Sequence, residues 1–154
     1  MAASSAGILM YRDVKQSLEV LLVHPGGPFW RNKDDGAWSI PKGEINAGEN
    51  PEDVAQREFM EELGSAPVEL LRPLGEIRQR GGKHVHAFAV KGDLDVQTIV
   101  SNTFEMEWPP RSGRLQTFPE VDRAEWFALP VARTKILEGQ RPFLDRLEQL
   151  AATS

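Results

Sequence analysis

The sequence contains no cysteine, which excludes disulfide bonds, thiolate metal sites and a cysteine nucleophile. It also lacks a long apolar run: the longest one near the start, residues 7–11, is far too short for a membrane span or the core of a signal peptide. A net positive charge is missing as well, since the formal charge is −5. We therefore expect a cytoplasmic protein that binds neither membranes nor duplex nucleic acid.

The composition of the 154 residues, with 40% hydrophobic and 27% charged side chains, is typical of a globular domain with its own core. The sequence shows no low-complexity tract and no internal repeat. We therefore expect residues 1–154 to form a single domain, present as a monomer or a homodimer.

The order of the predicted elements indicates an α/β fold. Apolar and β-branched side chains between turn-forming residues predict strands over 6–11, 18–24, 38–40, 74–80, 85–91, 103–108 and 125–129. Helices are predicted over 51–63 and from Pro142 onward, where apolar side chains repeat at helical spacing. Because the strands and helices follow no regular βαβ period, we expect a mixed sheet with helices on both faces.

The helix over 51–63 has the clearest boundary signals in the sequence. Asn50 suits the capping position, Pro51 suits the first helical position, and Gly64 suits the position that follows a helix. The side chains expected to anchor this helix to the core are Phe59, Met60 and Leu63.

The same helix gathers three carboxylates on one stripe. Glu58, Glu61 and Glu62 have the i, i+3, i+4 spacing of neighbours, and each like-charge pair destabilises an isolated helix by about 0.2–0.5 kcal/mol. A divalent cation between them would remove that repulsion, and Mg²⁺ prefers oxygen ligands. The stripe therefore predicts a site for Mg²⁺. Upstream, Gly43 allows a close backbone approach, and Lys42 suits a phosphate oxygen.

The segment over 43–65 resembles the box of the Nudix hydrolase superfamily. That pattern is Gly, five residues, Glu, seven residues, Arg-Glu, a hydrophobic residue, any residue, Glu-Glu, any residue, Gly and a hydrophobic residue. All seven fixed identities match, at Gly43, Glu49, Arg57, Glu58, Glu61, Glu62 and Gly64. Ser65 departs from the pattern at its last position, which concerns local packing rather than metal binding.

The resemblance implies an α/β/α sandwich that cleaves a diphosphate linkage, most often in a nucleoside derivative, with Mg²⁺ or Mn²⁺. It also implies a distal acidic residue before the late strand, and Glu120, six positions before Trp126, matches it. Glu105 and Glu107 are alternatives for that role. The residues expected at the metal are Gly43, Glu58, Glu61, Glu62 and Glu120. The catalytic set is Arg57, which would orient a carboxylate, with Glu61, Glu62 and Glu120, any of which could be the general base.

Substrate contacts are expected from side chains outside the box. The candidates are Lys42, Arg78, Arg80, Lys83 and Trp108, with Phe29, Trp30, His84 and His86 as weaker alternatives. The segment over 99–116 looks like an insertion that carries specificity. We expect a small nucleotide substrate, either a nucleoside or a dinucleoside polyphosphate. The alternatives are a sugar nucleotide, a diphosphoinositol polyphosphate, an RNA 5′ end, or a nucleotide-sensing module without turnover.

Overall fold

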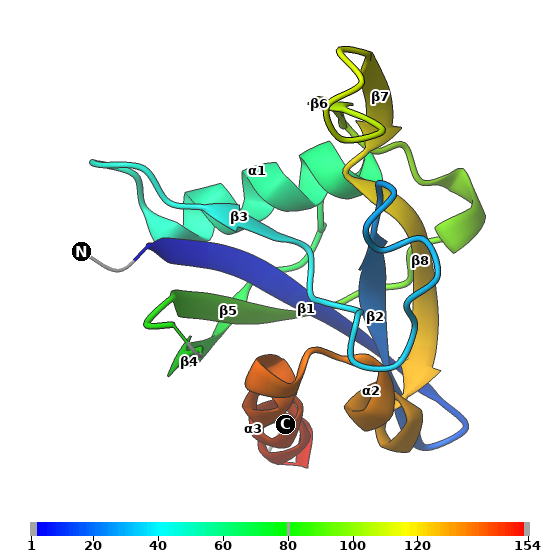
Figure 1. Ribbon diagram of the computed structural model, residues 1–154. Helices are drawn as coiled ribbons and strands as arrows, with labels where there is room; N and C mark the ends of the chain where they lie inside the picture. The colour runs from blue at the N-terminus through cyan, green and yellow to red at the C-terminus, as the bar shows by residue number, and fades with distance from the viewer. Residues whose placement is uncertain (1–2, 80, 153–154) are drawn as a thin grey trace.

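The computed structural model describes residues 3–79 and 81–152, and within them a six-stranded mixed sheet lies between helices (Figure 1). The strands are β1 (Ser4–Val14), β2 (Ser17–Pro25), β3 (Lys42–Glu44), β4 (Arg72–Arg78), β5 (His84–Lys91), β6 (Thr103–Glu107), β7 (Leu115–Pro119) and β8 (Val121–Ala128). The helices are α1 (Pro51–Leu63), α2 (Leu129–Lys135) and α3 (Arg141–Ala152), with short 3-10 helices η1 (Val96–Thr98) and η2 (Glu138–Gln140).

The sheet has the order β4-β5-β1-β2-β8, and β3 pairs separately with β1. β5 runs parallel to β1 along one edge, from the pair Ser4–His84 to the pair Tyr11–Lys91. β3 and β2 are antiparallel to β1 and must share its other edge, since β3 pairs with its first residues and β2 with its last. The sheet therefore divides beside the middle of β1, where Ile8 donates its N–H to the carbonyl of Pro41 at 3.1 Å.

The core occupies both faces of the sheet because successive strand residues point to opposite sides. In β1, Ala6, Ile8 and Met10 join the cluster that includes α1, whereas Leu9 and Tyr11 join the cluster that includes α3. Figure 1 shows α1 on one side of the sheet and α2 and α3 on the other. The predicted α/β fold, with a mixed sheet and helices on both faces, is confirmed.

Helix α1 begins and ends where its sequence predicts. The side chain of Asn50 accepts from the N–H of Glu52 at 2.8 Å, and Gly64 follows the helix with a left-handed φ of 79°. The expected anchoring role of Met60 is wrong, since this side chain is 47% exposed. Val54 and Ala55 are buried in its place, together with Phe59 and Leu63, because the apolar face turns with a period of 3.6 residues.

Several strand boundaries differ from the prediction. Residues 38–40 do not form a strand but make single bridges, from Trp38 to Ile136 and from Ser39 to Val23. This segment passes between β2 and the end of α2. It pairs with each of them at one residue only, which is too little for a strand. The late strand begins earlier than expected and ends at Ala128, because Pro130 suits the first turn of the unpredicted α2.

Strands β6 and β7 form a hairpin with its own two-stranded sheet, and we refer to residues 103–119 as the arm. The arm stands out from the body of the protein (Figure 1). Its first strand was predicted, whereas β7 was not, because a polar, exposed strand carries little apolar alternation. In the part of the chain that the structure describes, every helix is too short or too polar to span a bilayer.

Candidate active site

Three carboxylates from α1 and from the junction of β7 and β8 lie close together. Glu58 and Glu62 project from α1, and Glu120 lies between β7 and β8. One oxygen of each carboxylate lies within 4.8 Å of the others. Glu62 is only 6% exposed, so α1 directs it into the protein rather than into solvent.

Burial and mutual repulsion shape the electrostatics of this cluster. Burial, with the charges of Glu58 and Glu120, raises the pKa of Glu62 to about 8, although Lys42 and a hydrogen bond from its backbone N–H act in the opposite direction. The pKa of Glu58 is also raised, first by burial and then by Glu61. Burial lowers the pKa of Lys42, despite the nearby carboxylates. The negative charge of these clustered carboxylates is not balanced by the nearby cationic side chains that the structure describes. Mg²⁺ prefers oxygen ligands of this kind.

Gly43 allows the close approach between β3 and α1. A Cβ atom on Gly43 would overlap the carboxylate of Glu58, so a larger residue here would force this side chain to move. The predicted reason for glycine at this position, a close backbone approach, therefore has a specific partner in Glu58.

Arg57 connects the loop before α1 to the carboxylates on it. Its guanidinium donates to Glu49 at 2.5 Å and lies 3.7 Å from Glu58 and 4.0 Å from Glu61. Glu49 also accepts from the backbone N–H of Asn46 at 2.8 Å, and the hydrogen bond from Arg57 lowers the pKa of Glu49. Arg57 is thus held between Glu49 and the acidic stripe of α1.

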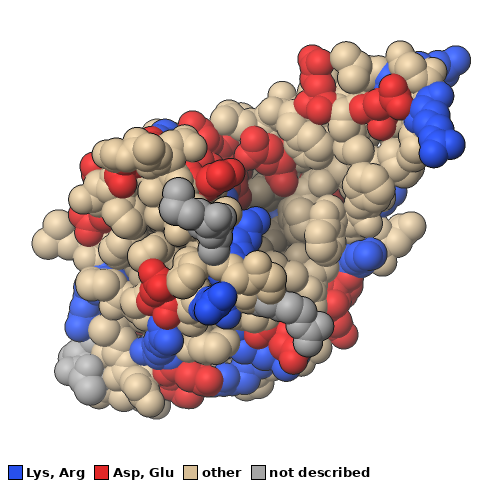
Figure 2. All heavy atoms as spheres, turned by 60° about the vertical axis from the view of Figure 1, so that its left-hand side comes forward, with Lys and Arg blue, Asp and Glu red and all other residues tan. Residues whose placement is uncertain are grey.

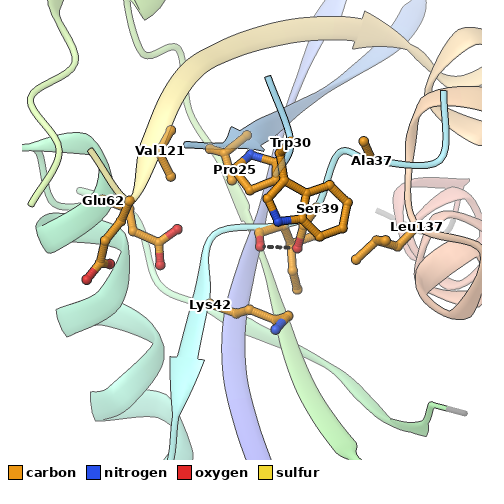
Figure 3. A pocket seen from close by; sticks show the side chains of 11 residues that line it. Pro25, Trp30, Ala37, Ser39, Lys42, Glu62, Val121 and Leu137 are labelled. Atoms are coloured by element: carbon orange, nitrogen blue, oxygen red, sulfur yellow. Dashed lines mark hydrogen bonds between the residues drawn. The ribbon is translucent and has the colours of Figure 1, made fainter. Parts of the chain in front are cut away.

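A pocket of about 200 Å³ opens beside Glu62 and Glu120. Most of its wall is apolar, and the residues that line it are Val23, Pro25, Trp30, Ala37, Ser39, Ile40, Lys42, Glu62, Glu120, Val121 and Leu137. Figure 3 shows Glu62 on one side of this pocket, the indole of Trp30 on the other, and Lys42 below them. Figure 2 shows a hollow in the surface, with acidic side chains on its rim and a basic side chain inside.

Buried polar side chains hold the wall of the pocket in place through hydrogen bonds. The side-chain oxygen of the fully buried Gln140 accepts from the N–H of Ile40 at 3.1 Å, and its amide donates to the hydroxyl of Ser39 at 3.0 Å. The equally buried His24 lies 2.8 Å from Asp122 and 2.7 Å from the carbonyl of Lys33. Sequence reasoning missed these residues, because their partners are up to 101 positions away.

The backbone of Glu120 is held from two sides. Its N–H donates to the carbonyl of Asn102 at 2.8 Å, and its carbonyl accepts from the N–H of Gly26 at 2.9 Å. Asn102 in turn donates its N–H to the carbonyl of Glu61 at the end of α1, at 2.8 Å. The start of the predicted insertion therefore connects the end of α1 to the backbone of Glu120.

Other predicted site residues lie outside the carboxylate cluster. Among the described residues, the group close enough to share an ion consists of Glu58, Glu62 and Glu120, without Glu61, Glu105 or Glu107. Glu107 accepts from the backbone N–H of Arg111 at 2.6 Å within the arm. The assignment of Glu61 as a ligand or base stays a prediction.

The predicted substrate-binding residues are dispersed. Lys42 lines the pocket, and Lys83 is close enough that its charge helps to lower the pKa of Lys42. Trp108 does not line the pocket but packs edge-on against Phe29, with ring centroids 5.4 Å apart. Arg78 lines a separate hollow beside the start of α3, and Arg80 lies outside the described residues.

The two weaker histidine candidates contact a carboxylate. His84 and His86 each lie within 2.9 Å of an oxygen of Glu76 on the neighbouring strand, at 2.8 and 2.9 Å. Each of the two histidines thus has a hydrogen-bonding partner on the surface of the sheet. Trp30, another of the weaker candidates, is the aromatic residue that lines the pocket.

Comparison with known proteins gives the family of this fold. The NUDIX domain family model matches residues 1–147. Among solved structures, an Ap4A hydrolase from C. elegans superposes with a TM-score of 0.65 at 22% identity, covering 99% of this chain and 100% of that one. The NUDIX domain of Shewanella oneidensis NrtR, solved with ADP ribose, gives a TM-score of 0.65 at 16% identity and covers 98% and 89%. At these identities the superpositions show a shared fold.

Sequence relatives match over shorter spans. An RNA pyrophosphohydrolase of Helicobacter pylori (strain G27) is 35% identical over 66 residues, covering 43% of this chain and 39% of that protein. A Myxococcus xanthus protein named octanoyltransferase is 32% identical over 117 residues, covering 75% of this chain and 30% of that protein. The chain thus spans well under half the length of either relative.

Proposed function

The chain belongs to the Nudix family of phosphoanhydride hydrolases, and we propose that it hydrolyses a diphosphate linkage in a nucleoside or dinucleoside polyphosphate with the help of a divalent cation. The observation that carries this proposal is that one pocket is lined both by the carboxylates of Glu62 and Glu120 and by Trp30. A polyphosphate needs cations beside it, which carboxylates can hold, whereas a nucleobase needs a flat apolar surface.

The residues that would hold the cation are Glu58 and Glu62, with Glu120 opposite them. When bound, such an ion neutralises phosphate oxygens and lowers the pKa of water. Lys42, whose side chain lines the same pocket, would place a second positive charge on the phosphate chain. Arg57 keeps Glu58 in place through the contacts that it makes with Glu49 and Glu58.

The attacking water needs a proton acceptor within hydrogen-bond reach. Of the three clustered carboxylates, Glu120 is the exposed one and Glu62 the buried one. We assign the proton acceptor to Glu120, because a water molecule from solvent reaches this carboxylate first. Glu62 then serves chiefly to hold the ion.

A substrate panel tests the proposal. Purified protein is incubated with nucleoside triphosphates, diadenosine tetraphosphate, ADP-ribose and a diphosphoinositol polyphosphate, with Mg²⁺ or with EDTA, and the products are separated by ion-exchange chromatography. We expect cleavage of a nucleoside or dinucleoside polyphosphate that EDTA abolishes, and no cleavage by Glu62→Gln. Tight nucleotide binding without turnover in any metal would instead identify a sensing module.

A second candidate substrate is the 5′ end of an RNA, which is favoured by the similarity to RNA pyrophosphohydrolases over 43% of the chain. The pocket of about 200 Å³ suits one nucleoside, and an RNA would have to continue across the open face of the protein. Adding a 5′-triphosphorylated oligonucleotide to the same panel separates the two candidates. A higher kcat/KM for the oligonucleotide than for any free nucleotide would select the RNA end.

A further inference from the structure

We propose that Ser101 is a positioning residue for Glu120, an inference that rests on the proposed catalytic role of that carboxylate. The hydroxyl of Ser101 accepts from the N–H of Val121 at 3.0 Å, immediately after Glu120. The same hydroxyl donates to the carbonyl of Asn102 at 2.8 Å. Ser101 therefore contacts the residue that follows Glu120 and the group that binds the N–H of Glu120.

These contacts fix both peptide groups that flank the Cα atom of Glu120. The peptide group before it is held by the carbonyl of Asn102, which accepts the N–H of Glu120 at 2.8 Å. The peptide group after it is held at its carbonyl by Gly26 and at its N–H by the hydroxyl of Ser101. Because two fixed peptide planes define φ and ψ, they also define the direction of the Cα–Cβ bond.

Glu120 needs this support because regular strand pairing is interrupted around it. It lies between β7, which belongs to the arm, and β8, which belongs to the main sheet. The pairing of β8 with β2 also shifts its register between His24 and Pro25, opposite this point. A serine hydroxyl supplies the hydrogen-bond acceptor for Val121 that a neighbouring strand would otherwise provide.

Ser101 is itself held against the helix that carries the other carboxylates. Its neighbours Val100 and Asn102 donate their N–H groups to the carbonyls of Leu63 and Glu61, at 3.2 and 2.8 Å. The last carbonyls of a helix have no partner within it, so the segment satisfies these groups and is fixed by them. The hydroxyl of Ser101 therefore helps to fix the position of Glu120 relative to α1.

The test uses the intact protein and its best substrate. We expect Ser101→Ala to lower kcat about tenfold with little change in KM, since only the transition state requires the placed carboxylate. Ser101→Thr keeps the hydroxyl and should retain kcat within about twofold. The matched control is Thr98→Ala, which removes a comparable hydrogen bond, from the Thr98 hydroxyl to the carbonyl of Asp95, at the end of η1. This control should leave kcat unchanged.

A double-mutant cycle with Glu120→Gln decides whether Ser101 acts through that residue. If it does, Ser101→Ala will have no further effect on kcat in the Glu120→Gln protein. Independent, multiplicative losses would overturn the inference, as would a normal kcat for Ser101→Ala beside an inactive Glu120→Gln. A normal kcat for Glu120→Gln itself would instead remove the proposed role of Glu120. Ser101→Cys, which keeps the side-chain size, replaces the alanine variant if that variant does not fold.

Discussion

The carboxylate of Glu58 lies directly against the backbone of Gly43, in the space that any larger side chain at this position would fill. The two residues come from β3 and α1, and their contact brings the acidic stripe of the helix down onto the divided sheet. Since the overlap would involve the carboxylate of Glu58, a proposed ligand of the cation, this contact concerns the proposed activity as well as packing.

Gly43→Ala should therefore displace Glu58 and lower the free energy of unfolding by about 1 kcal/mol or less, because the overlapped atoms belong to a flexible side chain that can move. Activity should fall more than stability, because the displaced group is a proposed ligand of the ion. Urea denaturation and steady-state kinetics measure the two effects. In a Glu58→Ala background the alanine at 43 should cost much less stability. An equal cost in both backgrounds would mean that the overlap with Glu58 is not the cause.

Divalent cations should stabilise the folded protein, because they bind the cluster of Glu58, Glu62 and Glu120 only when it is assembled. At a concentration one hundred times the Kd, the gain is about 2.7 kcal/mol. We expect Mg²⁺ and Mn²⁺ to raise the Tm of the parent protein but not that of Glu62→Gln. A Tm that stays unchanged throughout a titration with divalent ions would count against a preformed site.

Without metal, the stability of the protein should fall as the pH rises. The Glu62 carboxyl ionises around pH 4.5 in the unfolded chain but has a pKa of about 8 in the folded protein. Between these values the folded state holds one more proton, so its stabilisation is complete below pH 4.5 and is lost as the pH rises through 8. The limiting slope is about 1.4 kcal/mol per pH unit. Denaturation in EDTA should show this slope for the parent and a flatter profile for Glu62→Gln.

The two candidate tryptophans should differ in their effect on substrate affinity. Trp30 lines the pocket, whereas Trp108 belongs to the arm and packs on Phe29. We expect Trp30→Ala to raise KM about tenfold, the scale of one lost stacking contact. Trp108→Ala should have a smaller effect, through the position of the arm. If the order of the two effects is reversed, the arm contacts the substrate directly.

The distal acid can be identified by three conservative substitutions. Glu120→Gln should lower kcat and kcat/KM together by about 10²-fold, since a proton acceptor acts in the transition state. Glu105→Gln and Glu107→Gln should change the rate by less than about tenfold. A slow Glu107→Gln beside a normal Glu120→Gln would transfer the distal role to the arm.

Helical spacing predicted part of the carboxylate cluster, because the residues of the box that lie in α1 are close together in sequence. It placed Glu58 and Glu62 together, and the caps at Asn50 and Gly64 confirmed the limits of the helix. The same spacing could not show that Glu61 stays outside the cluster, since this depends on which side of the helix β3 approaches.

Contacts between distant segments could not be predicted from the sequence. Gly26, Ser101 and Gln140 give no periodic or motif signal, and their partners belong to other elements. The pocket itself depends on the division of the sheet, which follows from β2 and β3 sharing one edge of β1. Pairing of that kind is decided by the whole fold and not by local propensity.

The arm closes on itself at residues 102 and 120, and this has a consequence for how such proteins can diverge. In the described part of the chain, the strands beyond that closing hydrogen bond pair with each other and not with the main sheet. We therefore expect changes in the length of the hairpin to be tolerated as long as its two ends remain joined. The spacing of the three clustered carboxylates would stay unchanged while the hairpin varies, because none of residues 103–119 carries one of them.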